Sequence, residues 1–175
     1  MKRIISLLFA AMIMATSFGL SAQSLVGKWN STPGSQKAML EAIGAQFKET
    51  RVTQTFNDDS TYEIYAYLKI DMNIQGLQMS MFVEYIESGT WQYSDGTLTY
   101  ASNNYDFKNL EISFDDPTLN AFREDVIATM KSAFEQSKGI EISYDVEFFN
   151  ENEVRLTTNS EFIPNSYVFT ITRIE

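Results

Sequence analysis

TYEIYAYLKIDMNIQGLQMSMFVEY, residues 61–85, alternates between apolar and polar side chains with a period of two. Every even position up to 74 is apolar or aromatic, and after Gln75-Gly76 the apolar residues move to the odd positions. Side chains of a strand point alternately to its two faces, so the stretch predicts two antiparallel strands joined by a two-residue turn. The turn matches apolar with apolar in five pairs: Ile74 with Leu77, Met72 with Met79, Ile70 with Met81, Leu68 with Val83 and Ala66 with Tyr85. A slip of one residue would destroy every match, so the register is strongly specified.

Further strands are predicted on both sides of this hairpin. The Asp-Gly turn in SDGT, residues 94–97, is typical of a tight hairpin and would pair Tyr93 with Leu98 and Trp91 with Tyr100. Other strands are expected at about 106–114, at 140–149, after the turn NEN at 150–152, and at 167–174. In the hairpin around NEN, Glu147 would lie opposite Arg155. About eight antiparallel strands with short turns favour an up-and-down barrel, which leaves no open sheet edge.

Two helices are expected among the strands. One covers about 117–138, with Asp116 as its N-cap, Pro117 at its first position and Gly139 after its end. A shorter helix is predicted at about 34–47, where Met39, Ile43 and Phe47 recur at a spacing of four. We interpret both apolar stripes as surfaces that pack on the sheet or cap a barrel end, in preference to a role in recruiting a partner.

The first 22 residues predict export. Lys2 and Arg3 precede an apolar stretch at 4–15 and a small, polar segment at 16–22, which is the pattern of a signal peptide. The apolar part has about 12 residues, whereas a membrane-spanning helix needs about 20. Cleavage after residue 21 or after residue 22 leaves one domain at 23–175. The expected location is the periplasm or the cell exterior, with no integral membrane span.

Charge and composition restrict the function. Removal of Lys2 and Arg3 leaves 11 basic and 23 acidic residues, a net charge of −12, which would repel nucleic acid. The chain has no Cys, so no disulfide stabilises it, and no His, the commonest metal ligand and general base. The acid pairs in FNDDS (56–60) and FDDP (114–117) read as a turn and a helix cap in preference to a calcium site. We therefore expect no catalytic residues, no metal, no cofactor and no enzyme activity.

The motif Gly27-Lys28-Trp29 lies on the first predicted strand, and Arg173 lies on the last. Closure of a barrel makes these strands neighbours, so the Arg173 guanidinium is expected to stack on the Trp29 ring. Together with SGTWQYSDGTLTY at 88–100, this pattern resembles the lipocalin-like families, in particular small exported bacterial domains. The resemblance extends over residues 24–175. It implies a barrel closed at one end by Gly27, Trp29 and Arg173, although a typical lipocalin has its main helix nearer the end of the chain.

Aromatic and Met residues on the inner faces suggest a ligand. Buried phenols need hydrogen-bond partners, so the tyrosines suit either a partly wet cavity or the barrel ends. Six residues are predicted to line a cavity: Tyr62, Leu68, Met81, Val83, Tyr85 and Tyr93. Glu87 has inward parity and would hold a cationic group or act as a base with a raised pKa, unless a bulge near Ser88-Gly89 turns it outward, which we favour.

The sequence thus predicts an exported, non-catalytic protein that binds a small, mostly apolar molecule in its barrel. The alternative is a protein-interaction module whose barrel is filled by its own side chains. The identity of the ligand and the oligomeric state do not follow from the sequence.

Overall fold

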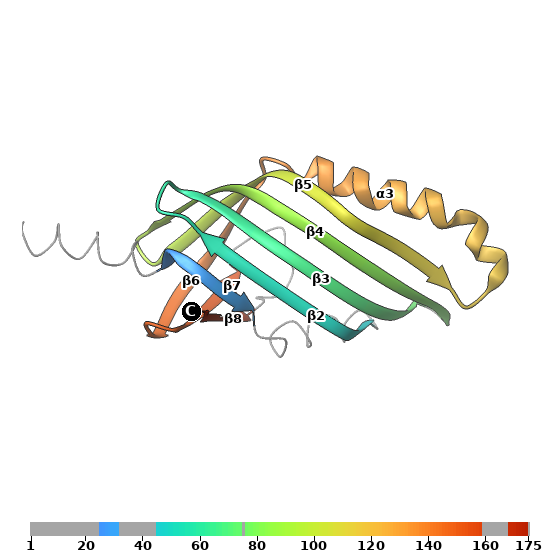
Figure 1. The fold of residues 1–175 in the computed structure, drawn as a ribbon, viewed down its shortest axis with the longest axis horizontal. Coiled ribbons are helices and arrows are strands. Elements are labelled where there is room, and N and C mark those ends of the chain that lie inside the picture. Colours follow the sequence, from blue (N-terminus) through green and yellow to red (C-terminus); the bar gives the residue numbers. More distant parts are fainter. Residues whose placement is uncertain (1–24, 32–44, 75, 159–167, 175) are drawn as a thin grey trace, which may run out of the picture.

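The structure is a computed structural model that describes residues 25–31, 45–74, 76–158 and 168–174. Eight antiparallel strands follow one another in chain order and close into a barrel (Figure 1). Their bounds are β1 Gly27–Ser31, β2 Ala45–Phe56, β3 Thr61–Ile74, β4 Leu77–Ser94, β5 Thr97–Phe114, β6 Glu141–Asn150, β7 Glu153–Thr158 and β8 Val168–Arg173. The predicted signal peptide at 1–22 lies outside the described residues. The mainly β, closed antiparallel architecture is confirmed.

The β3–β4 hairpin has the predicted register. All five predicted pairs are present, from Ile74 opposite Leu77 to Ala66 opposite Tyr85. Ala66 and Val83 are buried, whereas Lys69 is exposed on the opposite face. The pairs Tyr93–Leu98 and Trp91–Tyr100 are also present, as is Glu147 opposite Arg155. That last pair forms an exposed ion pair with an N–O distance of 3.0 Å.

The strand expected at about 106–114 is the second half of a longer strand. β5 runs for 18 residues from Thr97 to Phe114, and it stays paired with β4 along this length. Register shifts at Glu84/Tyr85 and at Ser88/Gly89 interrupt the ladder. Each bulge adds a residue and reverses the parity of one strand, which hides a continuous strand from a search for strict alternation.

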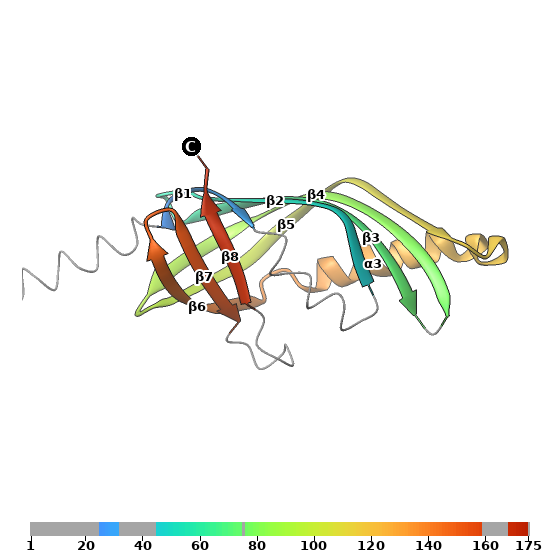
Figure 2. The same cartoon turned by 90° about the horizontal axis from the view of Figure 1, so that it is seen from below.

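The strands have unequal lengths, and this shapes the molecule. β2 to β5 have 12 to 18 residues, whereas β1, β7 and β8 have five or six. β6 pairs with β5 only at 97–101. The barrel is therefore closed over part of its length, and β2 to β5 continue beyond it as a curved sheet (Figure 2). Figure 1 shows helix α3 (Arg123–Gln136) beside the half of β5 that β6 leaves unpaired.

The helix prediction needs two corrections. Within the described residues α3 is the one α-helix, and a 3₁₀ helix, η1 (Pro117–Phe122), precedes it where a single helix over 117–138 was expected. Asp116 is the predicted N-cap, and its Oδ1 accepts a hydrogen bond of 2.9 Å from the Thr118 backbone N–H. Tight i→i+3 bonds are common in the first turn of a helix, which accounts for η1.

The second correction concerns the helix expected at 34–47. Residues 45–47 belong to β2, where Phe47 pairs with Ile70. Residues 34–44, which include Met39 and Ile43, lie outside the described part of the chain. A bulge between Phe47 and Glu49 shifts the parity of β2, so alternation across the bulge is lost. Without that alternation, the spacing of four between Met39, Ile43 and Phe47 was the remaining pattern, and it indicated a helix.

The predicted barrel closure is confirmed. Trp29 pairs directly with Arg173 on β8, and the guanidinium carbon lies 4.2 Å from the centre of the indole ring. Trp29 is fully buried, and its Nε1–H donates to the Leu25 carbonyl oxygen at 2.8 Å. Arg173 Nη1 donates to the Val26 carbonyl oxygen at 2.9 Å. The side chains therefore tie the first described residues to the last strand.

Gly27 makes this stacking possible. Its φ is +129°, a backbone conformation that side-chain-bearing residues rarely adopt. A Cβ at this position would lie 2.5 Å from Arg173 Nη1. The glycine of the first Gly-x-Trp thus leaves room for the guanidinium that covers the tryptophan.

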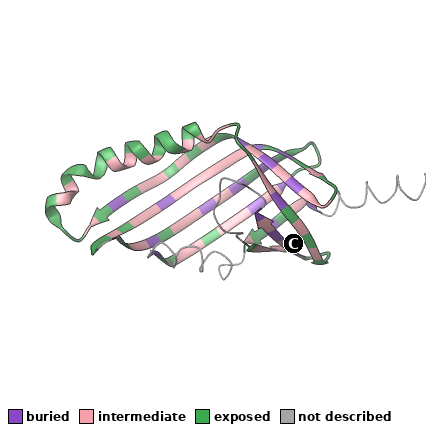
Figure 3. Ribbon diagram, turned by 180° about the vertical axis from the view of Figure 1, so that it is seen from behind, coloured by how far each residue is buried: buried purple, intermediate pink, exposed green. Residues whose placement is uncertain are grey.

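The main core fills the closed end of the barrel. Figure 3 shows buried positions alternating along the strands, whereas α3 contains no fully buried residue. The largest fully buried side chains there include Trp29, Phe56, Tyr62 and Leu98. A smaller cluster around Ala45 and Ile70 lies in the extension of the sheet. Of the helices in the described ranges, none has the length and apolar character needed to cross a membrane.

Replacement of Gly27 by Ala should test the closure. We expect Gly27→Ala to lower the free energy of unfolding by about 3 kcal/mol, because backbone strain adds to displacement of Arg173 from Trp29. Gly96→Ala is the matched control, since Gly96 also has a positive φ (+80°) but nothing lies within 4 Å of its added Cβ. It should lose only about 1 kcal/mol. Equal losses in urea unfolding would contradict a specific role for the Gly27–Arg173 contact.

Candidate functional site

A cavity of about 360 Å³ lies inside the barrel between the closed-end core and the extended sheet. Apolar and aromatic side chains form most of its wall, and Gln54, Glu87 and Ser102 contribute polar groups. The remaining lining residues are Phe47, Val52, Ile64, Ala66, Leu68, Ile70, Tyr85, Tyr100, Tyr105, Ile142, Tyr144, Leu156 and Phe169. Such a composition, mostly apolar with a few polar groups, is typical of small-molecule sites.

The structure brings part of the predicted ligand set together. Leu68 and Tyr85 line the cavity, and the Tyr62 ring lies just behind its wall, with its hydroxyl bonded to Glu87. Val83 is buried without lining the cavity, and Met81 packs with the Ala45–Ile70 cluster.

Tyr93 lies at the closed end, where its ring contacts Phe148 at a centroid distance of 6.1 Å. Parity therefore identified the inner face correctly for this residue too. It did not indicate how far along the barrel each residue lies.

A row of four side chains crosses the cavity wall at one level. Gln54 on β2 pairs with Ile64 on β3, Ile64 pairs with Glu87 on β4, and Glu87 pairs with Tyr105 on β5. All four residues line the cavity. The polar groups of Gln54 and Glu87 thus flank the apolar side chain of Ile64.

Glu87 points into the barrel, so the outward orientation that we favoured from the sequence is wrong. The Tyr62 hydroxyl donates to Glu87 Oε1 at 2.6 Å, and the Ser102 hydroxyl donates to the same oxygen. The two hydroxyls are 3.0 Å apart. The bulge does occur at Ser88/Gly89, but it follows Glu87, and its extra residue belongs to β5. It therefore leaves the parity of Glu87 unchanged.

Gly89 belongs to the second Gly-x-Trp and has a role in this network. A Cβ at Gly89 would lie 2.0 Å from the Ala101 carbonyl oxygen and 2.9 Å from Cε1 of Tyr62. The absence of a side chain lets β4 approach β5 at the bulge and lets the Tyr62 ring pass over the backbone. Gly89 thereby helps to place the Tyr62 hydroxyl on Glu87.

Gln54 is a cavity residue that sequence reasoning missed. Its side chain is 9% exposed, and within the described part of the chain its amide oxygen Oε1 has no hydrogen-bond partner. A buried acceptor without a partner is destabilising by about 1–3 kcal/mol. Ser102 was missed as well, although it continues the inward alternation of Leu98 and Tyr100 on β5. For Gln54 the corresponding signal was alternation with Val52 and Phe56, beyond the β2 bulge.

Burial changes the acid–base properties of the tyrosines around the cavity. It raises the pKa of Tyr85, and the neighbouring Glu87 raises it further. Burial together with the adjacent Tyr144 raises the pKa of Tyr100 well above its ordinary value. Burial and Glu87 likewise raise the pKa of Tyr62. These phenols therefore stay protonated in the folded protein. They contribute aromatic rings and hydrogen-bonding hydroxyls at the cavity.

Helix α3 lies against one side of the cavity wall. The Phe134 ring contacts Tyr85, Tyr105 and Phe107 at centroid distances of 5.5, 5.0 and 5.1 Å. The hydroxyl groups of Tyr105 and Ser137 lie 3.0 Å apart. A movement of α3 would therefore change the packing of two lining residues, Tyr85 and Tyr105.

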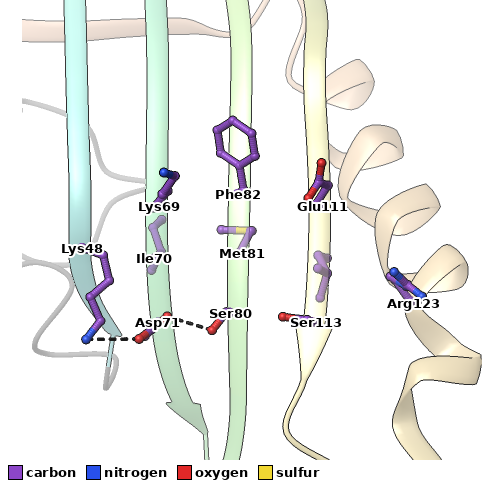
Figure 4. Close-up of a pocket in the computed structure, with 11 residues that line it drawn as sticks. Lys48, Lys69, Ile70, Asp71, Ser80, Met81, Phe82, Glu111, Ser113 and Arg123 are labelled. Carbon is purple, nitrogen blue, oxygen red and sulfur yellow. Dashed lines mark hydrogen bonds and ion pairs between the residues drawn. The ribbon is translucent and has the colours of Figure 1, made fainter. Parts of the chain in front are cut away.

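A groove of about 270 Å³ on the extended sheet offers a less suitable site (Figure 4). Both of its lysines are in ion pairs: Lys48 lies 3.2 Å from Asp71 in the groove, and Lys69 lies 3.1 Å from Glu49 outside the lining. The Ser80 hydroxyl donates to Asp71 at 2.8 Å. The groove is solvent-exposed and has several charged side chains, and exposed ion pairs of this kind contribute little energy, so it suits an apolar ligand less well than the barrel cavity does.

Comparison with known proteins adds no assignment. No family model matches the chain, and no curated protein matches its sequence. Across the described residues, no three acidic side chains gather closely enough to hold a metal ion. The function must therefore be inferred from the cavity itself.

The buried tyrosines predict a loss of stability at high pH. Tyrosine in an unfolded chain ionises near pH 10, whereas burial raises the pKa of Tyr100 in the folded barrel. Above about pH 10 the unfolded state therefore binds fewer protons, and the free energy of unfolding must fall. We expect urea unfolding to show this fall between pH 8 and pH 11. Tyr100→Phe should show a smaller fall, and an equal fall in both proteins would contradict the role of Tyr100.

Proposed function

We propose that this protein binds a small, mostly apolar molecule inside its β-barrel and catalyses no reaction. The observation that carries the proposal is the cavity of about 360 Å³ with its largely apolar wall. Ligand pockets for small molecules typically have about 300–1,000 Å³. Proteins otherwise pack their interiors densely, so a half-open cavity of this size in the barrel is a feature to be explained.

The contrast between the filled end of the barrel and the cavity supports the proposal. Closed-end residues such as Trp29, Phe56 and Leu98 fill their part of the barrel, and the same core includes cavity-lining residues such as Ile64 and Leu156. Ala66 and Ser102 are small residues in a wall that otherwise has larger side chains. Burial of apolar ligand surface here would contribute about 25 cal/mol per Å². Micromolar affinity, about −8 kcal/mol, is a reasonable expectation for such a ligand.

The proposal includes a lipocalin-like classification and a site of action outside the cytoplasm. The up-and-down order of the eight strands and the Trp29–Arg173 closure support the classification. The pattern of residues 1–22 supports export to the periplasm or the cell exterior.

The alternative is a module that binds a protein partner through its surface. That role would suit a filled barrel, and the cavity weighs against it. Exposed apolar residues such as Phe122 and Ile140 provide some support, since they are 57% and 49% exposed. They lie on different segments, however, Phe122 in η1 and Ile140 just before β6, and scattered exposed apolar residues are common on protein surfaces.

An uncharged fluorescent dye can test the binding function. N-phenyl-1-naphthylamine, which becomes brighter in apolar surroundings, should bind the purified protein with micromolar affinity. Ala66→Phe should weaken binding at least about tenfold, because the added ring occupies the cavity. Tyr93→Leu is the control, since Tyr93 lies in the closed-end core and outside the cavity lining.

The control variant should bind the dye as the natural protein does, even if its melting temperature falls. Equal dye binding by the natural protein and Ala66→Phe would place the dye elsewhere. No binding by the natural protein to a broad panel of apolar compounds would remove the proposed function.

A further inference from the structure

Two acceptor oxygens at the cavity have no hydrogen-bond partner among the described residues. The hydroxyls of Tyr62 and Ser102 both donate to Glu87 Oε1. No hydrogen bond or ion pair from the described residues reaches the other oxygen, Oε2. The buried amide oxygen of Gln54 is also without a partner in the described chain. The cavity thus presents two unmatched acceptors.

The lining of the cavity also carries a negative charge. Among the described residues that line it, Glu87 is charged and none is Lys or Arg. Glu87 is half-buried, and a carboxylate that is partly removed from water favours a cation or hydrogen-bond donors as partners. Here its fixed partners are two neutral hydroxyls on one oxygen, so the carboxylate remains able to bind a positive group.

The apolar side chain of Ile64 lies between the two residues that carry the acceptors. Gln54 and Glu87 lie on either side of Ile64 in one cross-strand row. Two interstrand spacings correspond to about 10 Å. Aromatic rings adjoin the carboxylate, since Tyr105 is its neighbour in the row and Tyr85 lies two residues before it on β4. Aromatic faces attract cations, particularly away from water.

Resting on the proposed function, we propose that the ligand is an amphipathic amine whose protonated nitrogen donates to Glu87 Oε2. Its apolar body lies over Ile64, Ala66 and Leu68, and a second donor on that body is accepted by Gln54 Oε1. Charge-assisted hydrogen bonds are about twice as strong as neutral ones, so the amine contributes selectivity as well as affinity. Fatty acids and other apolar anions are disfavoured, because a ligand carboxylate would meet the Glu87 carboxylate without a neutralising cation.

Three compounds with the same apolar body test the proposal: 2-(1-naphthyl)ethylamine, 1-ethylnaphthalene and 1-naphthylacetate. Each competes with N-phenyl-1-naphthylamine for the natural protein at neutral pH and about 0.15 M salt. The amine should displace the dye at a concentration at least about tenfold lower than the neutral compound, a difference of about 1.4 kcal/mol. The naphthylacetate should be the weakest competitor. This comparison requires no variant and is unaffected by any loss of stability.

Variants of two glutamates on the same strand locate the effect. Glu87→Gln keeps an acceptor for Tyr62 and Ser102 but removes the charge, so the preference for the amine should fall to about that of the neutral compound. Glu84→Gln is the matched control, because Glu84 accepts from the Tyr65 hydroxyl and does not line the cavity. It should keep the full preference. Thermal melting followed by circular dichroism verifies that both variants are folded.

The possible outcomes separate the two proposals. Dye binding with equal or stronger competition by the neutral or anionic compound would overturn the amine proposal and leave the binding function intact. Retention of the amine preference in Glu87→Gln would also overturn it. Failure of the dye and of all three compounds to bind would overturn the function and the amine proposal together.

Discussion

Contact between the first and last strands is the interaction on which the rest of the structure depends. β1 and β8 pair over three residues, and Trp29 opposite Arg173 is one of these pairs. Three ladder positions give a short seam, so the buried indole and the guanidinium above it carry much of the closure. Without closure β1 and β8 would become exposed edges, and the interior would be an open sheet face. Gly27 matters because a side chain at this position would occupy the space of the Arg173 guanidinium.

Closure over part of the barrel length creates the cavity. The short strands β1, β7 and β8 surround a densely packed core, and the longer strands β2 to β5 continue beyond it. Residues on the inner face of the long strands therefore have neighbours on one side and incomplete packing opposite. Phe134 of α3 fills part of this space against Tyr85 and Tyr105. The cavity is thus a consequence of unequal strand length, without any special feature at a single residue.

Periodicity predicted which face each residue occupies, and bulges mark where that method failed. The 61–85 hairpin has uninterrupted alternation in sequence, and its register was predicted in full. On β2 the bulge at Phe47/Glu49 shifts the parity, so residues 45–47 were assigned to a helix and Gln54 was overlooked. Near Glu87 the bulge was anticipated at the right position, Ser88/Gly89, but its extra residue lies on β5 and not on β4, so Glu87 keeps its inward orientation. Alternation also does not indicate how far along the barrel axis a residue lies. For this reason Met81, Val83 and Tyr93 were predicted to line the cavity, although they do not.

Two polar residues at the cavity are difficult to explain by stability alone. Glu87 is half-buried, and replacement of a charged interior group by a well-packed apolar residue is often neutral or stabilising. The same reasoning applies to Gln54, whose oxygen forfeits solvation without gaining a partner in the described chain. A barrel that needed only to be filled would be better served by Leu or Met at both positions. Tyr62, Ser102 and Gly89 instead hold Glu87 in one orientation. An oriented acceptor that weakens the folded state is the expected signature of a group whose partner arrives from outside the chain.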